Sequence, residues 1–363
     1  MRREMRNQNT SSSIKKHKSL FSDGKLCYTG GKEIFGGILM KPKVIVYSRV
    51  PEDVLARIKE TCSVTYYEKL TDDNHSEFMK ELTEAEGVLG SGLKVDKSLL
   101  EKAPKLSVVS NITVGYDNLT IRDLTECGVL ATNTPTVLDD TVADTMMSLI
   151  LATRRRVVEL DELVKSGNWK ASLTQEHFGL DVHHKKLGII GMGRVGQTVA
   201  KRAAGGFDME ILYHNRSRNN WAEETYGATY CSLDELLEQS DVVCLLTPLT
   251  KETYDLMGAE QFKLMKETAV FINGSRGATV DEEALIQALE EGEIYAAGLD
   301  VFKEEPVPAD HPLLRMKNVV TLPHIGSATL ETRHKMAQLA ADNLIASLSG
   351  DNPPTPINPE VRS

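Results

Sequence analysis

The sequence predicts an α/β protein with two domains, each built on a parallel sheet, and three observations support this. The chain has 363 residues, too many for one hydrophobic core of typical size. From Lys41 to Pro323, short apolar runs typical of strands alternate with helical patterns. One strand is separated from the following helix by a G-x-G-x-x-G turn, as in dinucleotide-binding domains.

Residues 1–40 differ in composition from the rest of the chain. They contain eight Lys and Arg against three Asp and Glu, and they show no apolar core of a signal peptide. This composition indicates a disordered segment. A second hypothesis is a non-native extension: Gly36-Gly37 can be encoded by a ribosome-binding sequence, and translation would then start at Met40.

The next part of the chain contains two loops that follow predicted strands, Gly90–Leu93 and Thr113–Asp117. Loops at the carboxyl ends of parallel strands bind ligands, and small residues there can offer backbone N–H groups to a carboxylate; ordinary turns are the alternative. Five strands are predicted here: Val44–Tyr47, Val64–Tyr67, Gly87–Leu89, Leu106–Ser110 and Val129–Thr132.

A long apolar helix is expected from Asp140 to Lys165, with Asp140 or Thr141 as its N-cap. Arg154–Arg156 would belong to its solvated end. The segment Ala171–His184 then has the pattern of an extended arm, which favours a dimer.

The glycine turn Gly191–Gly196 follows the predicted strand Leu187–Ile190 and opens a predicted helix. Its first glycine would form the tight turn, the second would admit a pyrophosphate, and the third would let the helix pack closely on the strand. The free amides of the helix N-terminus favour a phosphate. A methyltransferase loop and a plain tight turn are the alternatives. The expected cofactor-binding residues of the turn are Gly191, Gly193, Arg194, Val195 and Gly196.

The end of the second strand, Glu210–His214, indicates which dinucleotide binds. An NAD site usually has an acidic residue here, about 20 residues after the turn, to accept a hydrogen bond from the ribose 2′-hydroxyl. This chain has Asn215, Arg216, Ser217 and Arg218 instead. Two arginines and a hydroxyl suit a 2′-phosphate, so NADPH is expected as the preferred cofactor, with NAD possible. Solvated surface arginines are the alternative.

Three polar residues, Arg276, Asp300 and His324, each follow a predicted strand, and Glu305 lies shortly after Asp300. Each alone also fits a surface or capping role. Together they suit hydride transfer to a 2-keto acid. Arg276 would hold the carboxylate and polarise the carbonyl, His324 would be the general acid, and Glu305 would stabilise its imidazolium. Asp300 is better placed to contact the nicotinamide carboxamide than to transfer a proton.

Four sequence motifs resemble the D-isomer-specific 2-hydroxyacid dehydrogenase family, and within it the glyoxylate/hydroxypyruvate and 2-ketogluconate reductases. They are GMGRVG, INGSRG (272–277), GLDVFKEEP (298–306) and LPHIGSAT (322–329). The resemblance implies catalytic roles for Arg276, Glu305 and His324. It implies substrate contacts at Val114, Gly115 and Arg276. It implies cofactor contacts at Gly193, Arg194, Val195, Pro248, Gly274, Asp300 and Gly326.

The resemblance also implies how the domains are arranged. An NAD(P)-binding Rossmann domain, residues 140–326, is inserted into a flavodoxin-like substrate domain made of residues 41–139 and 327–363. The C-terminal helix Leu330–Leu348 completes the substrate domain. The expected reaction is NADPH-dependent reduction of glyoxylate, hydroxypyruvate or 2-ketogluconate to a D-2-hydroxy acid. An NAD(P)-sensing corepressor on the same fold is the alternative.

Composition bears on partners and location. A net charge of −10 disfavours nucleic acid, and no apolar run reaches the roughly 18 residues of a membrane span. The five cysteines lack metal-ligand spacing, so no metal is expected and a reducing cytoplasm fits. The expected partners are the small keto acid and a second copy of the chain. Room for the longer 2-ketogluconate is expected at the small residues Gly90–Gly92.

Overall fold

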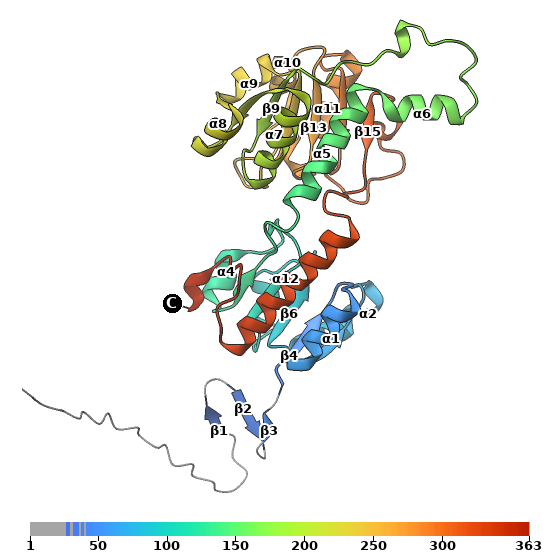
Figure 1. The fold of residues 1–363 in the computed structure, drawn as a ribbon. Coiled ribbons are helices and arrows are strands. Elements are labelled where there is room, and N and C mark those ends of the chain that lie inside the picture. Colours follow the sequence, from blue (N-terminus) through green and yellow to red (C-terminus); the bar gives the residue numbers. More distant parts are fainter. Residues whose placement is uncertain (1–26, 30–31, 36–37, 40, 363) are drawn as a thin grey trace, which may run out of the picture.

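The computed structural model describes residues 27–29, 32–35, 38–39 and 41–362. It contains two domains, each with a parallel sheet between helices, and this confirms the predicted fold class (Figure 1). In the N-terminal segment, short antiparallel strands pair as β1 (Cys27–Thr29), β2 (Lys32–Phe35) and β3 (Ile38–Leu39). The remainder of residues 1–40, for which disorder or a non-native origin was expected, lies outside the described residues.

The first domain is a five-stranded parallel sheet in the order β5-β4-β6-β7-β8. Numbered from its own first strand this is 2-1-3-4-5, the flavodoxin-like order, so that β4 and β6 flank the point where the strand order reverses. The strands are β4 (Lys43–Val46), β5 (Ser63–Tyr66), β6 (Gly87–Gly90), β7 (Val108–Asn111) and β8 (Leu130–Thr132).

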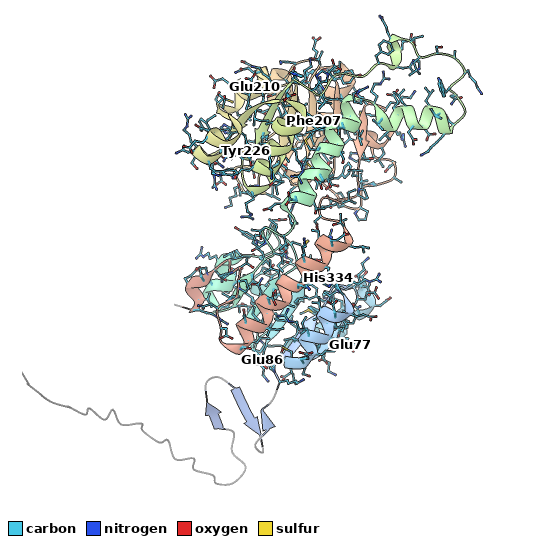
Figure 2. All side chains as sticks on the ribbon, viewed as in Figure 1. Glu77, Glu86, Phe207, Glu210, Tyr226 and His334 are labelled. Atoms are coloured by element: carbon cyan, nitrogen blue, oxygen red, sulfur yellow. The ribbon has the colours of Figure 1, made fainter. Side chains whose placement is uncertain are left out.

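Helices cover both faces of this sheet. On one face lie α2 (Asp72–Leu82), α3 (Lys97–Leu100) and α4 (Ile121–Glu126), and their buried side chains include Phe78 and Leu124. On the other lie α1 (Glu52–Thr61) and the C-terminal helix α12 (Leu330–Ser349), which bury Ile58 and Leu344. Figure 2 labels His334 on α12, and its Nε2 lies 2.9 Å from Oδ2 of Asp53 on α1. The C-terminal helix therefore completes the first domain.

The second domain is a seven-stranded parallel sheet in the order β11-β10-β9-β12-β13-β14-β15. Its first six strands have the 3-2-1-4-5-6 order of a dinucleotide-binding fold, which reverses between β9 and β12. The strands are β9 (Lys186–Ile190), β10 (Glu210–His214), β11 (Thr229–Tyr230), β12 (Val242–Leu245), β13 (Val270–Asn273), β14 (Ala296–Leu299) and β15 (Val319–Thr321).

Two helical layers enclose this second sheet. One contains α5 (Asp139–Arg154), α7 (Arg194–Phe207) and α8 (Asn220–Tyr226). The other contains α9 (Leu233–Gln239), α10 (Ala259–Leu264) and α11 (Glu282–Glu291). Figure 2 labels Phe207 and Glu210 where α7 ends and β10 begins. Helix α8 and the two-residue strand β11 were not predicted from the sequence.

The expectation of one helix from Asp140 to Lys165 is wrong, because the chain breaks between α5 and α6 (Val157–Lys165). Arg156 has the left-handed φ of 54°, which ends the helical path. Arg154 is 3% exposed, and its guanidinium donates to the backbone oxygens of Asp181 and Asp241. Arg154 and Arg156 therefore fix the turn, and only Arg155 is exposed as expected. The expected N-cap was also wrong, because α5 starts at Asp139 with Leu138 as N-cap.

The chain crosses between the domains twice, before α5 and before α12. The two crossings touch, because Thr141 Oγ1 lies 2.6 Å from Thr332 Oγ1 and Thr145 Oγ1 donates to the Gly326 oxygen at 3.4 Å. Beyond α5, helix α6 and the segment to His184 project from the second domain (Figure 1). No helix in the described part of the chain has both the length and the apolar composition of a membrane span.

Candidate active site

The glycine turn after β9 has a different structural requirement at each glycine. Gly191 has φ 104°, and an added Cβ would lie 2.8 Å from the carbonyl carbon of Leu246. A Cβ on Gly196 would overlap the carbonyl oxygen of Gly191. At Gly193, by contrast, no described atom lies within 4 Å of an added Cβ. The first and third glycines are thus required by packing, while the second leaves the backbone open to a ligand.

The start of α7 fits a dinucleotide phosphate. Within the described residues no side chain caps this helix at Gly193, and its first turn contains no acidic residue. The first amides of a helix have no partner inside the helix, and they carry the positive end of its dipole. Beside the turn, Thr247 Oγ1 is buried without a hydrogen-bond partner in the described structure. Arg194 at the first helical position pairs with Asp139 at 3.4 Å.

The four residues after β10, Asn215 to Arg218, differ in their side-chain contacts. Asn215 Oδ1 accepts from the Met192 amide at 2.9 Å, which ties this segment to the glycine turn. Arg218 donates to Glu223 at 2.8 Å and lies 5.4 Å from the centre of the Tyr230 ring. Arg216, Ser217 and Arg218 are all exposed. Because Glu223 neutralises Arg218, Arg216 is the better candidate for a cofactor phosphate.

His324 and Glu305 form a hydrogen-bonded pair, as expected for an acid and its partner. His324 Nδ1 lies 2.7 Å from Glu305 Oε2, and Glu305 Oε1 accepts from the Phe302 amide at 3.0 Å. Burial raises the pKa of Glu305, but the hydrogen bonds from His324 and Phe302 outweigh it and hold that pKa below its usual value. With Nδ1 bonded to Glu305, Nε2 is the nitrogen left to face a substrate.

Asp300 fixes the loop on which His324 lies. His324 has a left-handed φ of 55°, and the carboxylate of Asp300 accepts from the amides of Ile325 at 2.7 Å and Gly326 at 2.8 Å. Asp300 is 2% exposed, and burial raises its pKa even though both amides favour its charged form. Cofactor contacts were also expected at Asp300 and Gly326, and these stay predictions. In the structure they bind each other and thereby position His324.

Arg276 follows β13 in the second domain, yet its side chain reaches the loop after β7 in the first. Its Nε donates to Asp117 Oδ1 at 3.1 Å and its Nη1 donates to the Ser275 oxygen at 2.8 Å. Nη2 lies so close to Gly115 that an added Cβ there would overlap it. Arg276, Val114 and Gly115 are therefore brought together across the two domains. No role was predicted for the Asp117 side chain, because a carboxylate is not an expected ligand in a loop that binds a carboxylate.

Side chains hold the carbonyl groups of the Val114–Gly115 loop. Asn133 Nδ2 donates to the Val114 oxygen at 2.8 Å, and the buried Asn111 donates to the Gly115 oxygen at 3.2 Å. The N–H and C=O of a trans peptide point in opposite directions, so these bonds also orient the loop amides. Like Asp117, Asn111 and Asn133 were not identified from the sequence.

Close packing requires a glycine at positions 274 and 90. A Cβ on Gly274 would overlap the sulfur of Met146 on α5, and a Cβ on Gly90 would overlap the Tyr47 ring. The space expected at Gly90 for a long substrate is thus filled by Tyr47, while Gly92, with φ 80°, borders open space. The Pro248 oxygen accepts from Thr253 Oγ1 at 2.7 Å, which shapes the loop after β12.

The chain is similar to known dehydrogenases over most of its length. Residues 147–326 match the family model of the D-isomer specific 2-hydroxyacid dehydrogenase, NAD binding domain. Glyoxylate/hydroxypyruvate reductase B of Escherichia fergusonii is 55% identical over 322 residues, which cover 89% of this chain and 99% of that protein. The protein of the same name from Erwinia tasmaniensis is 53% identical over 320 residues, with 88% and 100% covered. The chain therefore belongs to the D-isomer-specific 2-hydroxyacid dehydrogenases.

Within that family it belongs to the glyoxylate/hydroxypyruvate reductase branch of NAD(P)-dependent enzymes. A solved Thermus thermophilus protein is 39% identical with a TM-score of 0.81, covering 87% of this chain and 99% of that one. The NADPH-dependent glyoxylate/hydroxypyruvate reductase of Sinorhizobium meliloti, solved with NADP and malonate, is 32% identical with a TM-score of 0.77. That match covers 87% of this chain and 97% of the Sinorhizobium chain.

Proposed function

We propose that this protein reduces small 2-keto acids to D-2-hydroxy acids with NADPH, and that glyoxylate, hydroxypyruvate and 2-ketogluconate are its candidate substrates. The observation that supports this best is the 2.7 Å contact of Glu305 with His324, which lies on the loop that Asp300 fixes. Arg276, from the second domain, places a cation beside the Gly115 backbone of the first domain.

In the proposed mechanism, Arg276 and the amides of the Val114–Gly115 loop bind the substrate carboxylate. The nicotinamide, when bound, supplies the hydride. His324 Nε2 donates a proton to the carbonyl oxygen as negative charge develops there. Glu305 stabilises the imidazolium before the transfer and keeps Nδ1 protonated throughout, so that Nε2 alone exchanges the proton.

The preference for NADPH rests on Arg216. No acidic residue stands at 215–218, and Arg218 is already paired with Glu223. Arg216 and Ser217 are exposed and can bind a 2′-phosphate by a charge-assisted hydrogen bond. The Sinorhizobium relative, whose name includes NADPH dependence, supports this choice.

The deciding experiment measures initial rates of the full chain with NADPH and with NADH, on glyoxylate, hydroxypyruvate and 2-ketogluconate in turn. Turnover with NADPH well above NADH is expected, and chiral chromatography should identify the D-product. If NADPH binds but no keto acid is reduced, the protein is a dinucleotide-binding protein, as in the corepressor alternative. The relatives above, which are named reductases, do not favour that alternative.

The substrate length can be tested at Ser91, which lies beside the open space at Gly92 and whose amide donates to Ser48 Oγ at 3.0 Å. A Ser91→Phe variant should lose 2-ketogluconate turnover and keep glyoxylate turnover, because the ring would occupy the space that only a longer substrate needs. Equal losses on both substrates would show that a longer substrate does not extend past this loop.

We also propose a homodimer formed through α6 and the arm that follows it. None of the residues of α6 is buried, and the segment exposes apolar side chains. They are Val157, Val158, Val164, Trp169, Leu173 and Phe178. Beside Val158 lies a cavity of about 360 Å³ at the amino ends of β14 and β15, away from Arg276 and His324. Light scattering should give twice the chain mass, and Val158→Asp should shift it to the monomer.

A further inference from the structure

We propose that Asp117 is a positioning residue for Arg276, and that their ion pair makes carboxylate recognition depend on contact between the two domains. The inference rests on the proposed function and extends it to a residue that the mechanism does not use. Asp117 follows β7 in the first domain, and Arg276 follows β13 in the second, 159 residues later in the chain.

The contacts of the guanidinium support this inference. A guanidinium has five N–H groups in a fixed plane. Two of its three nitrogens are held: Nε by Asp117 at 3.1 Å and Nη1 by the Ser275 oxygen at 2.8 Å. Bonds at two nitrogens fix the orientation of the plane. The third nitrogen, Nη2, lies against Gly115, in the loop whose amides bind the substrate carboxylate in the proposed mechanism.

The geometry at Gly115 shows that the pair is built closely into the loop. A Cβ there would overlap Arg276 Nη2 and would lie 3.1 Å from Asp117 Oδ1. The bare backbone of Gly115 thus lets the two side chains meet. The loop itself is held by Asn111 and Asn133, so Asp117 is presented from a fixed support.

A carboxylate beside a carboxylate-binding site has an electrostatic cost, since it partly neutralises Arg276 and repels the substrate. An exposed ion pair contributes little stability, and these side chains are about one-third exposed, at 37% and 31%. Stability alone therefore does not account for Asp117. Orientation does, because a bidentate or stacked arginine loses its effect when its plane rotates.

The arrangement also connects the domains. If the domains separate, Asp117 leaves Nε, and the plane of Arg276 is no longer fixed relative to the Val114–Gly115 amides. A substrate carboxylate bound to Nη2 and to those amides holds the same two elements together. Binding of the carboxylate and docking of the domains thus favour each other, which is the relation expected for thermodynamically linked events.

The test uses Asp117→Asn in the full chain, with Asp342→Asn as the matched control. Asp342 forms an ion pair with Arg57 between α12 and α1 and is 38% exposed, similar to Asp117. We expect kcat/KM for glyoxylate to fall 10- to 100-fold in Asp117→Asn and to change less than twofold in Asp342→Asn. The NADPH dissociation constant should stay within twofold in both. Asp117→Glu, which keeps the charge, should recover part of the loss.

A double-mutant cycle distinguishes positioning from a general structural effect. In an Arg276→Lys background, which lacks the planar fork, Asp117→Asn should lower kcat/KM by less than a further twofold. Full additivity would overturn the proposal. So would unchanged kcat/KM in Asp117→Asn, or a loss accompanied by equally weakened NADPH binding and a lowered unfolding temperature.

Binding of oxalate, a carboxylate probe that is not reduced, separates failure of this inference from failure of the proposed function. The oxalate dissociation constant in the presence of NADPH should rise about tenfold in Asp117→Asn. If the wild-type chain reduces no keto acid, the proposed function fails while this measurement still tests the pair. If Arg276→Lys weakens oxalate binding and Asp117→Asn does not, the positioning role is wrong.

Discussion

The glycine turn and the His324–Arg276 region both lie at carboxyl ends of strands, but they are built differently. The turn occupies six consecutive residues, and its properties come from the backbone of Gly191 and Gly196. The second region takes side chains from three strand ends of one domain and a loop of the other. Binding at the glycine turn therefore depends on local backbone conformation, whereas the His324–Arg276 region depends on how strands, loops and domains pack together. Mutations should therefore separate binding from turnover.

The largest expected effect is on turnover, at His324. A His324→Gln variant keeps a polar group beside Glu305 but loses the transferable proton. We expect kcat to fall about 10²- to 10⁴-fold, the usual contribution of a general acid. The NADPH dissociation constant, measured by fluorescence titration, should not change. Loss of NADPH binding in this variant would show that the two regions are not separable.

Next in size is the contrast between two glycines of the turn. Gly191→Ala puts a side chain at φ 104° and against Leu246, and should lower the free energy of unfolding by about 1–3 kcal/mol. Gly193→Ala meets open space, so its stability should equal that of the wild type while NADPH affinity falls about tenfold. Denaturant unfolding and cofactor titration of both variants check this; equal stability losses would contradict it.

A similar loss of stability, without any effect on catalysis, is expected at the amino ends of the strands of the second sheet, opposite the candidate active site. Asp241 precedes β12, and it accepts from the Lys186 amide at 2.9 Å and from Lys266 at 3.0 Å. Asp241→Asn should cost about 1–3 kcal/mol of unfolding free energy at pH 7 and leave kcat unchanged. A fall in kcat would show that the amino ends of the strands are not independent of the active site.

The stability that Asp241 contributes depends on pH. Burial raises the pKa of Asp241, but the Lys186 amide and Lys266 outweigh burial, so its folded pKa lies below the ordinary value. A depressed carboxyl pKa contributes stability above the unfolded pKa of about 3.9, and that contribution is lost as pH falls through the folded value. The wild-type and Asp241→Asn unfolding curves should therefore converge in acid.

The smallest expected effect concerns the choice of cofactor. Arg216→Ala should raise the KM for NADPH about tenfold, the equivalent of one charge-assisted hydrogen bond, with little change for NADH. Arg218→Ala is the matched comparison, because Arg218 is already paired with Glu223. Equal effects at both positions, or equal effects on both cofactors, would refute the role given to Arg216.

Some of the fold and site could be predicted from neighbouring residues alone. The alternation of strands and helices, the turn at Gly191–Gly196 and the strand ends at Arg276 and His324 depend on local periodicity. The break after α5 could not be predicted, because it depends on Arg154 reaching Asp181 and Asp241. In the sequence, three consecutive arginines indicate the solvated end of a helix. The structure shows that one of them, Arg154, binds backbone carbonyl groups instead.

Residue types and their spacing were enough to predict the α/β class, the dinucleotide turn, the absence of an acidic residue at 215–218 and the candidate residues Arg276, Glu305 and His324. The side-chain contacts, by contrast, follow only from the folded structure. It showed that Asp300 holds the His324 loop, that Gly90 and Gly274 admit Tyr47 and Met146, and that Asp117 binds Arg276. The reason is physical: backbone conformation is set largely by adjacent residues, whereas these contacts join residues far apart in the chain and exist only once the sheets and domains have packed together.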